Sequence, residues 1–519
     1  MRHSKVTIVC SCVIFTGLFA TPQLETPRLF KPPQTYPGGG AGGAFQLATG
    51  DLTGDGKVDL VVADLCLSVA DCSTGGVGIL LGAGDGTFQN GQTIASGGVE
   101  ALSVAVGDVN GDGLLDVVVA NQCQSVSNCT RGAVGVLLGN GDGTFQAVRS
   151  FYSGGYYASA IAVEDVDGDG KLDLLVVNSC VTNSDCKKGD VGVLLGNGDG
   201  TFHAAQSYSS DGAYPAGIAV ADVNGDGKLD LIVANNSFIG NQSSGAVTVL
   251  LGNGDGTFQP AVGYASGGQG ASAVAAIDVN GDGKLDLLVA NVSGNSAQGA
   301  GALGVLLGNG DGTFQPAQSY STSGSSSFSV AVADVSGDGK PDAIVSNYCG
   351  INDPACTSPS VTVFLGSGNG SFTASKTYKP GGLYTESVAV ADVNGDGRPD
   401  LLVDNFSPIG NSDANIAVLL STAHFATTTR LSSDPDPSAY GQLVTLTAKV
   451  SSVDPGIPIG GGVTFNMGEQ SLGFAKISDG VATLKTTKLA VGQRTITATY
   501  GGDSVSDKSV SPELVQIVK

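Results

Sequence analysis

The sequence predicts an all-β protein, a seven-bladed β-propeller followed by an immunoglobulin-like β-sandwich. Three observations support this prediction. A unit of 56–58 residues recurs seven times, as the spacing of seven similar aspartate-rich loops shows. Each unit contains four short apolar runs with the alternation that is typical of strands, without helical periodicity. After residue 425 the repeat ends and a different alternating pattern begins.

Every unit has the same order of features. A run such as SVAVADV leads into the aspartate-rich loop, and a run such as LDLLVAN leaves it. A polar loop, a third run such as AVGVLLG, a turn such as LGNGDGTF and a fourth short run follow. Seven four-stranded units of this length indicate a propeller rather than an open solenoid. The predicted propeller spans residues 30–425.

The two ends of the array predict that the ring closes. The last unit stops at VLLSTAHFATTT, without a full turn or fourth strand, while FKPPQTY at residues 30–36 matches the fourth-strand sequence FQPAQSY. We therefore expect the N-terminal segment to complete the last blade, which removes the open sheet edges. Recurring fourth-strand tyrosines are expected to pack between blades. They are Tyr208, Tyr264, Tyr320 and Tyr378.

The N-terminus has the pattern of a secretory signal peptide. Basic residues come first, Val6–Phe19 is apolar, and Ala20 precedes Thr-Pro. The apolar run is too short to span a bilayer comfortably, so we expect a signal peptide at residues 1–20 and a linker at 21–29. A lipoprotein site at Cys12 is an alternative, although it comes early in the run. The mature protein is expected to be secreted or on the cell surface, without membrane insertion.

Charge and histidine content narrow the functional classes. The chain has 47 acidic and 24 basic residues and a net charge of -23. This balance argues against nucleic acid and anionic membrane surfaces as partners. Beyond the N-terminal 20 residues, only His203 and His424 could serve in histidine-based chemistry.

Each unit carries a nine-residue loop with side-chain oxygen atoms at positions 1, 3, 5 and 9. Positions 1, 5 and 9 are aspartate in all seven copies. Hard oxygen ligands at this density suit calcium, and we expect up to seven ions. A turn without metal, the alternative, would be indifferent to position 9. The predicted ligands are Asp51, Thr53, Asp55, Asp59, Asp108, Asn110, Asp112, Asp116, Asp165, Asp167, Asp169, Asp173, Asp222, Asn224, Asp226, Asp230, Asp278, Asn280, Asp282, Asp286, Asp334, Ser336, Asp338, Asp342, Asp392, Asn394, Asp396 and Asp400.

The tetrapeptide NGDG also recurs in LGNGDGTF, which lacks the leading and trailing aspartates. Asn-Gly and Asp-Gly favour tight hairpin turns with positive φ. We interpret this second copy as a turn rather than as a metal site.

The apolar strand, the loop DVNGDGKLD and the strand LLVAN resemble FG-GAP/VCBS repeats, which form the propeller of integrin α-subunits and of many secreted bacterial proteins. The resemblance covers about residues 30–425. It implies a seven-bladed propeller with calcium in the hairpin between the first and second strands of each blade. It implies no single activity, because such propellers serve in adhesion, in carbohydrate binding and occasionally in catalysis.

Eight cysteines beyond the leader form four local pairs, all in the polar loop between the second and third predicted strands. The other three units replace both members together, which is what disulfides predict. Disulfides also agree with export. The predicted pairs are Cys66 with Cys72, Cys123 with Cys129, Cys180 with Cys186, and Cys349 with Cys356.

Residues 426–519 read as alternating strands and predict an immunoglobulin-like sandwich without an inter-sheet disulfide. The strings SAYGQLVTLTAKV and ITATYGGD resemble bacterial Ig-like repeats. Such repeats usually act as spacers or stalks on surface proteins.

One set of residues could bind a ligand on the face opposite the calcium loops. Eight residues before the first aspartate of each loop the chain has Gly43, Glu100, Tyr157, Tyr214, Gly270, Ser326 and Tyr384. The first strand of a blade lies innermost, so this position should ring the mouth of the central channel. The tyrosines there, with the adjacent Tyr156, could stack on sugar rings or hold a protein side chain. Aromatic plugs that merely fill a funnel are the alternative.

The functional prediction is a calcium-stabilised binding or adhesion module for an extracellular carbohydrate or protein ligand. A carbohydrate-active enzyme, such as a polysaccharide lyase, and a purely structural surface component are the alternatives. We expect no catalysis, because no GxSxG motif is present and no carboxylate pair stands out of register with the repeat. Glu100 and Glu386 are isolated in the sequence.

Overall fold

The computed structural model describes residues 29–519 with short gaps at 69, 90, 128, 130, 183–185, 239–243, 295–298, 351–352, 354–355, 407–414, 423–425, 453–458, 469 and 504–505. The predicted signal peptide, nearly all of the predicted linker and His424 therefore lie outside the described residues. No helix in the described part of the chain has the length and hydropathy of a membrane span.

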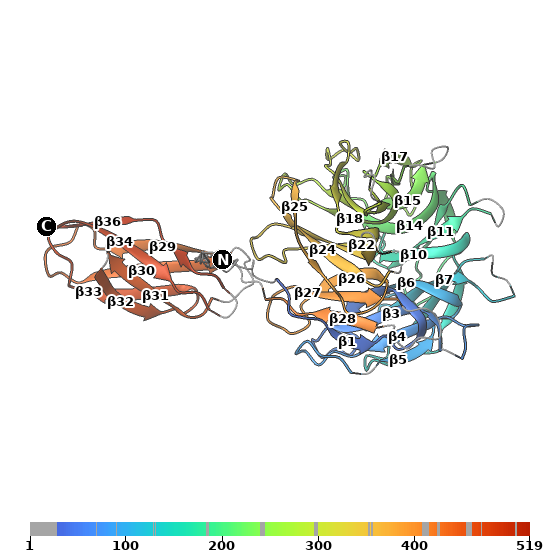
Figure 1. Cartoon of the computed structure of the whole chain (residues 1–519), viewed down its shortest axis with the longest axis horizontal. Helices are drawn as coiled ribbons and strands as arrows, with labels where there is room; N and C mark the ends of the chain where they lie inside the picture. The colour runs from blue at the N-terminus through green and yellow to red at the C-terminus, as the bar shows by residue number, and fades with distance from the viewer. Residues whose placement is uncertain are drawn as a thin grey trace, which may run out of the picture.

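Seven four-stranded antiparallel sheets form a propeller, as predicted (Figure 1). We number the blades by their predicted loops. Blade 1 contains β2(Ala41–Gly50), β3(Asp59–Cys66), β4(Gly76–Leu80) and β5(Gln92–Ala95). Blade 2 contains β6(Val99–Gly107), β7(Asp116–Cys123), β8(Ala133–Leu137) and β9(Arg149–Tyr152). Blade 3 contains β10(Tyr156–Glu164), β11(Asp173–Cys180), β12(Asp190–Leu194) and β13(Gln206–Ser209). Blade 4 contains β14(Gly212–Ala221), β15(Asp230–Phe238), β16(Ala246–Leu250) and β17(Val262–Ala265). Blade 5 contains β18(Gln269–Ile277), β19(Asp286–Ser293), β20(Ala302–Leu306) and β21(Gln318–Ser321). Blade 6 contains β22(Gly324–Ala333), β23(Asp342–Gly350), β24(Ser360–Gly366) and β25(Phe372–Tyr378).

Blade 7 closes the ring with strands from both ends of the array. Its sheet has the order β1(Gln34–Pro37), β28(Asn415–Leu419), β27(Asp400–Asn405), β26(Thr385–Ala391). Tyr36 of β1 lies opposite Ile416 of β28. The prediction that FKPPQTY supplies the missing fourth strand is confirmed, and β28 is thereby paired on both sides.

The core of the propeller lies between neighbouring blades. The central strands of each blade are buried on both faces, so their sequences are continuous apolar runs rather than alternating ones. Val118 and Val134 of blade 2, for example, share a cluster with Ile161 and Leu174 of blade 3.

Fourth-strand tyrosines pack between blades, as predicted. The Tyr208 ring of blade 3 meets the Phe258 ring of blade 4 edge-on at 5.4 Å, and Tyr264 meets Phe314 in the same way. Because each phenylalanine comes from a GDGTF turn, this contact ties the outer strand of one blade to the turn of the next.

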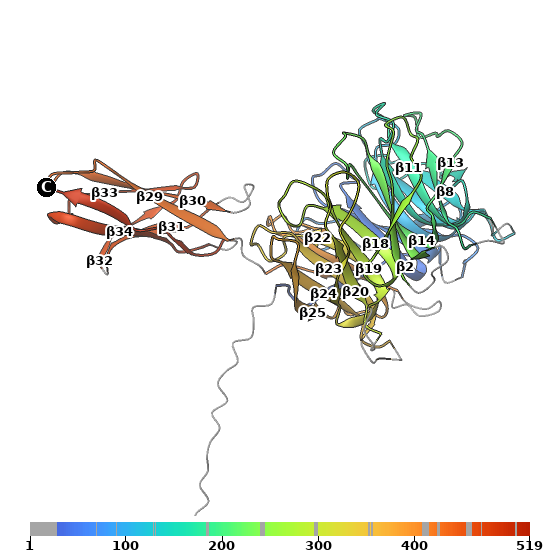
Figure 2. The same ribbon diagram turned by 90° about the horizontal axis from the view of Figure 1, so that it is seen from above.

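The C-terminal region is a β-sandwich of two sheets, drawn as a separate body beside the propeller in Figures 1 and 2. One sheet contains β29(Thr427–Asp434), β30(Val444–Ser452) and β33(Val481–Thr486), and the other contains β32(Gln470–Lys476), β31(Gly462–Met467), β34(Gly492–Tyr500), β35(Ser509–Val510) and β36(Leu514–Val518). Leu446, Phe465, Ile496 and Tyr500 are fully buried between the sheets. The sandwich therefore has a core of its own.

Candidate metal centres and binding face

The seven nine-residue loops occupy equivalent hairpins. Each connects the first strand of a blade to its second strand, and the aspartate at position 9 is the first residue of that second strand. The seven predicted ligand sets therefore stand in equivalent places around one face of the ring.

Position 1 organises each loop through backbone hydrogen bonds. In blade 3, Asp165 accepts the backbone N–H groups of Gly168 and Gly170, both at 2.8 Å. The N–H of the glycine at position 6 donates to the aspartate at position 1 in every loop, at 2.7–2.8 Å. Gly170 has a φ of 84°, which favours glycine. The residue pattern thus fixes a curled loop by itself.

Position 9 has a structural role that the sequence alone did not reveal. The Asp173 carboxylate accepts the N–H of Val166 at 3.0 Å and the N–H of Gly196 at 2.7 Å. Equivalent pairs of bonds occur in all seven blades. These bonds join the loop to the segment that follows the third strand, so the aspartate at position 9 has a structural role with or without metal. The expectation that a metal-free turn would be indifferent to position 9 is therefore wrong.

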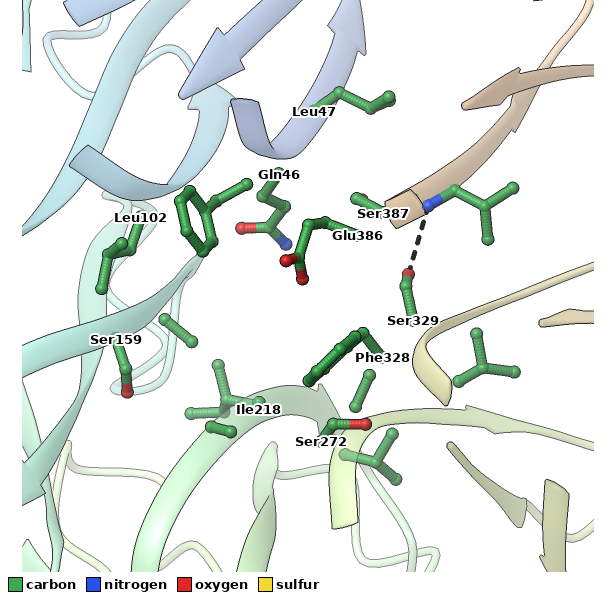
Figure 3. Close-up of a pocket in the computed structure, with 18 of the residues that line it drawn as sticks. Gln46, Leu47, Leu102, Ser159, Ile218, Ser272, Phe328, Ser329, Glu386 and Ser387 are labelled. Atoms are coloured by element: carbon green, nitrogen blue, oxygen red, sulfur yellow. Dashed lines mark hydrogen bonds between the residues drawn. The ribbon is translucent and has the colours of Figure 1, made fainter. Parts of the chain in front are cut away.

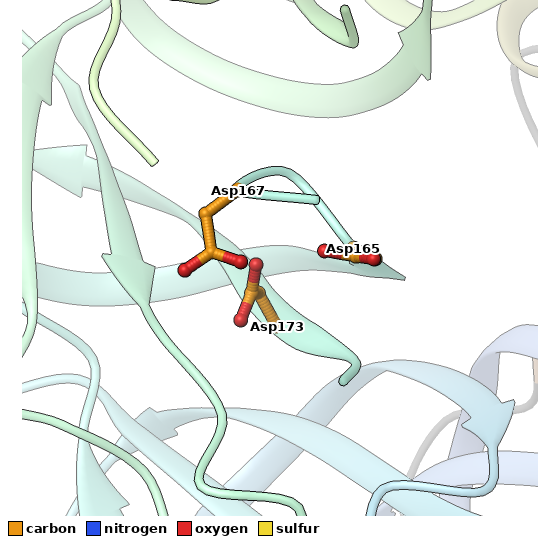
Figure 4. A group of neighbouring side chains, drawn as sticks. All are labelled: Asp165, Asp167 and Asp173. Atoms are coloured by element: carbon orange, nitrogen blue, oxygen red, sulfur yellow. The ribbon is translucent and has the colours of Figure 1, made fainter. Parts of the chain in front are cut away.

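Blade 3 brings three loop carboxylates together. Oxygen atoms of Asp165, Asp167 and Asp173 lie within 4.8 Å of one another (Figure 4). Asp169 at position 5 is instead paired with Lys171, with 2.6 Å between Oδ2 and Nζ. The structure therefore unites positions 1, 3 and 9 there and leaves position 5 turned to the lysine. The other six loops have Asn, Ser or Thr at position 3 and so carry fewer charges.

Electrostatics favour a cation at this cluster. Burial raises the pKa of Asp173 to about 6, two backbone hydrogen bonds oppose that shift, and the charges of Asp167 and Asp165 add to it. A divalent cation would relieve the repulsion among carboxylates. The donors are all oxygen atoms, which is the ligand chemistry of calcium. The residues present therefore fit this ion.

The second NGDG copy is a hairpin turn in the structure. In blade 2, Asn140 N–H donates to the Thr144 carbonyl at 3.0 Å, and Thr144 N–H donates to Asp142 at 2.9 Å. Gly141 and Gly143 have φ values of 75° and 80°. The aspartate of this motif is thus used within its own turn.

These turns also contact the loops of the preceding blades. The Gly200 N–H in the blade 3 turn donates to the Val109 carbonyl in the blade 2 loop at 3.2 Å. This hydrogen bond therefore couples the conformation of the blade 2 loop to the turn of blade 3.

The four predicted disulfides are present between strands two and three of blades 1, 2, 3 and 6. Sulfur atoms join Cys66 to Cys72, Cys123 to Cys129, Cys180 to Cys186, and Cys349 to Cys356. These loops lie at the opposite end of the second strand from the aspartate loops, so they define the opposite face of the ring.

The predicted ligand-binding tyrosines lie toward this opposite face on three blades. Tyr157, Tyr214 and Tyr384 have φ values of 59°, 50° and 50°, and a register shift begins one residue after each of them. The Tyr214 side chain is 52% exposed. Tyr384 is packed, with its ring stacked on Tyr348 at 4.8 Å. The four tyrosines are thus distributed over blades 3, 4 and 7, with Tyr156 next to Tyr157.

A cavity of about 360 Å³ lies at the centre of the propeller and is lined by the innermost strands of all seven blades (Figure 3). Its walls begin two residues further along each first strand than the tyrosine position. Among the described residues that line it, Glu386 is the only acidic or basic one.

Glu386 is isolated in the sequence, but in the fold it belongs to a group of acidic residues that affect one another. Burial raises the pKa of Asp404, a fully buried carboxyl group of β27, and the charges of Asp64 and Glu386 add to this shift. Sequence reasoning missed Asp64 and Asp404 because both lie inside apolar second strands. Alignment of the seven second strands would have found them, since both break the repeat.

Comparisons with known proteins agree with the architecture. A family model described as an FG-GAP-like repeat matches residues 63–119, 125–176, 180–233, 237–289, 292–345 and 350–403. A model described as bacterial Ig-like domain (group 3) matches residues 431–519. A search of curated proteins gave no match.

Two similar solved structures come from Bacteroides species. One is a candidate 6-phosphogluconolactonase from Bacteroides fragilis, with 12% identity and a TM-score of 0.44, covering 84% of this chain and 99% of that one. The other is the extracellular domain of a candidate one-component system from B. thetaiotaomicron, with 9% identity and a TM-score of 0.42, covering 95% of this chain and 58% of that one. Likenesses this distant carry no functional argument.

Proposed function

Because the chain belongs to the FG-GAP-like repeat family, we propose that it is a secreted or cell-surface binding or adhesion module. Up to seven calcium ions stabilise the propeller in this proposal. The face opposite the calcium loops takes an extracellular carbohydrate or protein ligand. The disulfides and the bacterial Ig-like domain support an extracellular location.

The backbone conformation of the tyrosines carries the proposal. Tyr157, Tyr214 and Tyr384 occupy left-handed positions, where a side chain costs about 1 kcal/mol relative to glycine. Blade 5 has Gly270 at the same position, with φ 67°, while Glu100 and Ser326 have φ 56° in blades 2 and 6. A strained tyrosine where glycine would be relaxed points to selection for the side chain itself. Tyr214, which is more than half exposed, is the clearest case.

A calcium role for the opposite loops is supported by their preformed shape and their charge. The loops hold 22 of the 47 acidic residues, and seven divalent ions would change the formal net charge from -23 to -9. This role stabilises the scaffold, and the ligand is bound elsewhere.

A carbohydrate-active enzyme is the second candidate, and one observation limits it. Cleavage of a glycosidic bond by acid–base chemistry usually needs two carboxyl groups flanking the substrate. Among the described residues that line the central cavity, Glu386 supplies one such group. Asp404 is fully buried behind the wall and does not reach the lumen. Binding is therefore the better-supported function.

A glycan array probed with calcium-loaded full-length protein tests the proposal. We expect binding to at least one glycan class and its loss in Tyr214→Ser. Tyr440→Ser is the control, because Tyr440 is also exposed but belongs to the sandwich. Binding to no glycan and to no cell-surface extract would favour a purely structural component, and turnover of a polysaccharide would favour the enzyme.

A further inference from the structure

Two buried acids break the repeat at the junction between blades 1 and 7. Asp64 of β3 stands where the other six second strands have asparagine. Those asparagines are Asn121, Asn178, Asn235, Asn291, Asn347 and Asn405. Asp404 of β27 stands where the other second strands have small uncharged residues, namely Ala63, Ala120, Val177, Ala234, Ala290 and Ser346. Each of these two departures from the repeat places a carboxyl group in a second strand of the propeller.

The asparagines in other blades have partners that Asp64 lacks. Asn121 accepts the Ser96 hydroxyl at 2.5 Å and donates to the Ser96 carbonyl at 3.1 Å. Near Asp64 the corresponding neighbour is Gly38, which has no hydroxyl group. Asp64 accepts one bond, from the Gly40 N–H at 3.0 Å, and its other oxygen has no partner among the described residues.

Asp404 lies directly behind the channel wall. It pairs in register with Ser387, which lines the cavity. The Asp404 side chain is fully buried, and neither of its oxygens has a hydrogen-bond partner among the described residues. Buried carboxyl groups without partners are costly. In the described structure the bond from Gly40 to Asp64 is the one hydrogen bond that these two acids accept.

Glu386 is the third repeat-breaking acid, and it faces the lumen (Figure 3). It belongs to a ring with one residue from each blade, six residues before the first aspartate of each loop. From blade 1 to blade 7 this ring consists of Phe45, Leu102, Ser159, Ala216, Ser272, Phe328 and Glu386. Glu386 is thus flanked by phenylalanines of the two adjacent blades. Burial raises its pKa to about 8, and a cation bound beside it would favour the ionised carboxylate.

Aromatic rings continue from these two phenylalanines and connect across blade 7. Phe328 contacts Tyr348 at 5.4 Å, Tyr348 stacks on Tyr384 at 4.8 Å, and Tyr384 contacts Phe406 at 6.0 Å. Phe406 in turn contacts Phe45 at 5.5 Å. We call these five residues the aromatic arc. Phe45 and Phe328, the two ends of the arc, line the cavity together with Glu386. Burial raises the pKa of Tyr348 to about 12, and the charge of Glu386 adds to this shift.

We propose that this sector, formed by Glu386 and the aromatic arc, binds an amino sugar with a free ammonium group. The inference deepens the binding role proposed above and rests on it. An ammonium group complements a lumenal carboxyl group that has buried acids behind it and no basic residue among the described lining residues. Aromatic faces attract cations and also stack on sugar rings.

The size of the cavity supports a small ligand. A volume of about 360 Å³ lies at the lower end of the range for small-molecule sites. Ser159, Ser272 and Ser329 also line the cavity, so hydroxyl groups of a sugar have hydrogen-bonding groups nearby. In this proposal the ammonium group meets Glu386 while the sugar ring lies against Phe45 or Phe328, the two arc residues that line the cavity.

Calorimetric titration of calcium-loaded full-length protein with four probes tests the inference. Glucosamine carries both ring and charge, glucose and N-acetylglucosamine carry the ring alone, and propylamine carries the charge alone. We expect glucosamine to bind about tenfold or more tightly than each of the other three, the scale of one charged hydrogen bond.

Glu386→Gln keeps the shape of the side chain and should lower glucosamine affinity by about tenfold or more. Glu513→Gln, the same chemical change at an exposed residue of the C-terminal sandwich, is the matched control and should bind as the wild type does. The inference is overturned if glucosamine does not bind, if N-acetylglucosamine or propylamine binds equally well, or if Glu386→Gln has no effect. The probe comparison on wild-type protein stands even if a variant fails to fold.

The outcome is separable from that of the proposed function. Glycan binding that depends on Tyr214 but not on Glu386 would overturn this inference alone. Glucosamine binding that depends on Glu386, without any glycan binding through Tyr214, would move the binding role from the outer face to the channel.

Discussion

The Asp173 carboxylate and the Gly196 backbone N–H are joined by a 2.7 Å hydrogen bond that links the aspartate loop of blade 3 to its next hairpin. Asp173 is the ninth loop residue and also part of the acidic cluster with Asp165 and Asp167. One carboxylate thus serves the fold and the candidate metal centre. Loss of metal and loss of this side chain should therefore have different consequences.

Chelation of divalent cations should lower the melting temperature of the propeller. In blade 3 oxygen atoms of three loop carboxylates lie within 4.8 Å of one another, and every loop has three or four aspartates within nine residues. Without a cation their repulsion destabilises the folded state. Scanning calorimetry with calcium and with chelator, followed by calcium replenishment, measures this. An unchanged melting temperature would refute the metal assignment.

Asp173→Asn and Asp169→Asn should separate structure from metal binding. In chelator, Asp173→Asn should lose about 1–3 kcal/mol of stability, because a carboxamide has one acceptor oxygen for two backbone donors. Asp169→Asn loses only a surface ion pair with Lys171 and should change stability little under these conditions. Urea unfolding of both variants in chelator provides the comparison. Equal losses would show that position 9 has no special structural role.

Tyr214→Gly should retain or raise the stability of the propeller while it weakens ligand binding. Glycine relieves the left-handed backbone strain at φ 50°, a gain of up to about 1 kcal/mol. Tyr208→Ala, by contrast, removes an inter-blade aromatic contact and should destabilise. Thermal unfolding and glycan binding are measured on both. A marked destabilisation by Tyr214→Gly would mean that this tyrosine is a packing residue.

Asp64→Asn should flatten the pH dependence of stability. Burial raises the folded-state pKa of Asp64 to about 8, against a usual value of 3.8, so the folded chain retains a proton that the unfolded chain releases. This contribution stabilises the fold at low pH and is lost as pH rises from about 4 to about 8. The loop carboxylates titrate in both the wild type and Asp64→Asn, so their effects cancel in the difference between the two unfolding free energies.

The Asp64→Asn substitution introduces the residue type found at this position in the other six blades and removes one charge near Asp404. The stability of this variant relative to wild type should therefore grow from about pH 4 to about pH 8, as measured by chemical unfolding at several pH values. A constant difference across this range would show that Asp64 does not titrate there.

Much of the architecture was predictable because it repeats. Seven copies of one pattern give seven independent readings of the same strands, loops and turns, and the lone fourth strand at residues 30–36 revealed the closure. The candidate site was less predictable. Glu386 could be seen as an unusual residue, but its neighbours Asp64 and Asp404 lie at opposite ends of the array and meet only when the ring closes.

The sequence by itself determined the local chemistry: strand periodicity, turn residues, the oxygen-rich loops and the spacing of the cysteine pairs. These properties depend on residues close together in the chain. The tertiary structure decided which groups share an environment. The fold supplies the hydrogen bonds from position 9 to the next hairpin. It packs Tyr384 against Tyr348 but leaves Tyr214 exposed. It also places Glu386 between Phe45 and Phe328 in the ring that lines the cavity. Closure of the ring joins the first and last blades. Burial at this junction raises the pKa of Asp64 and Asp404, which are far apart in the sequence.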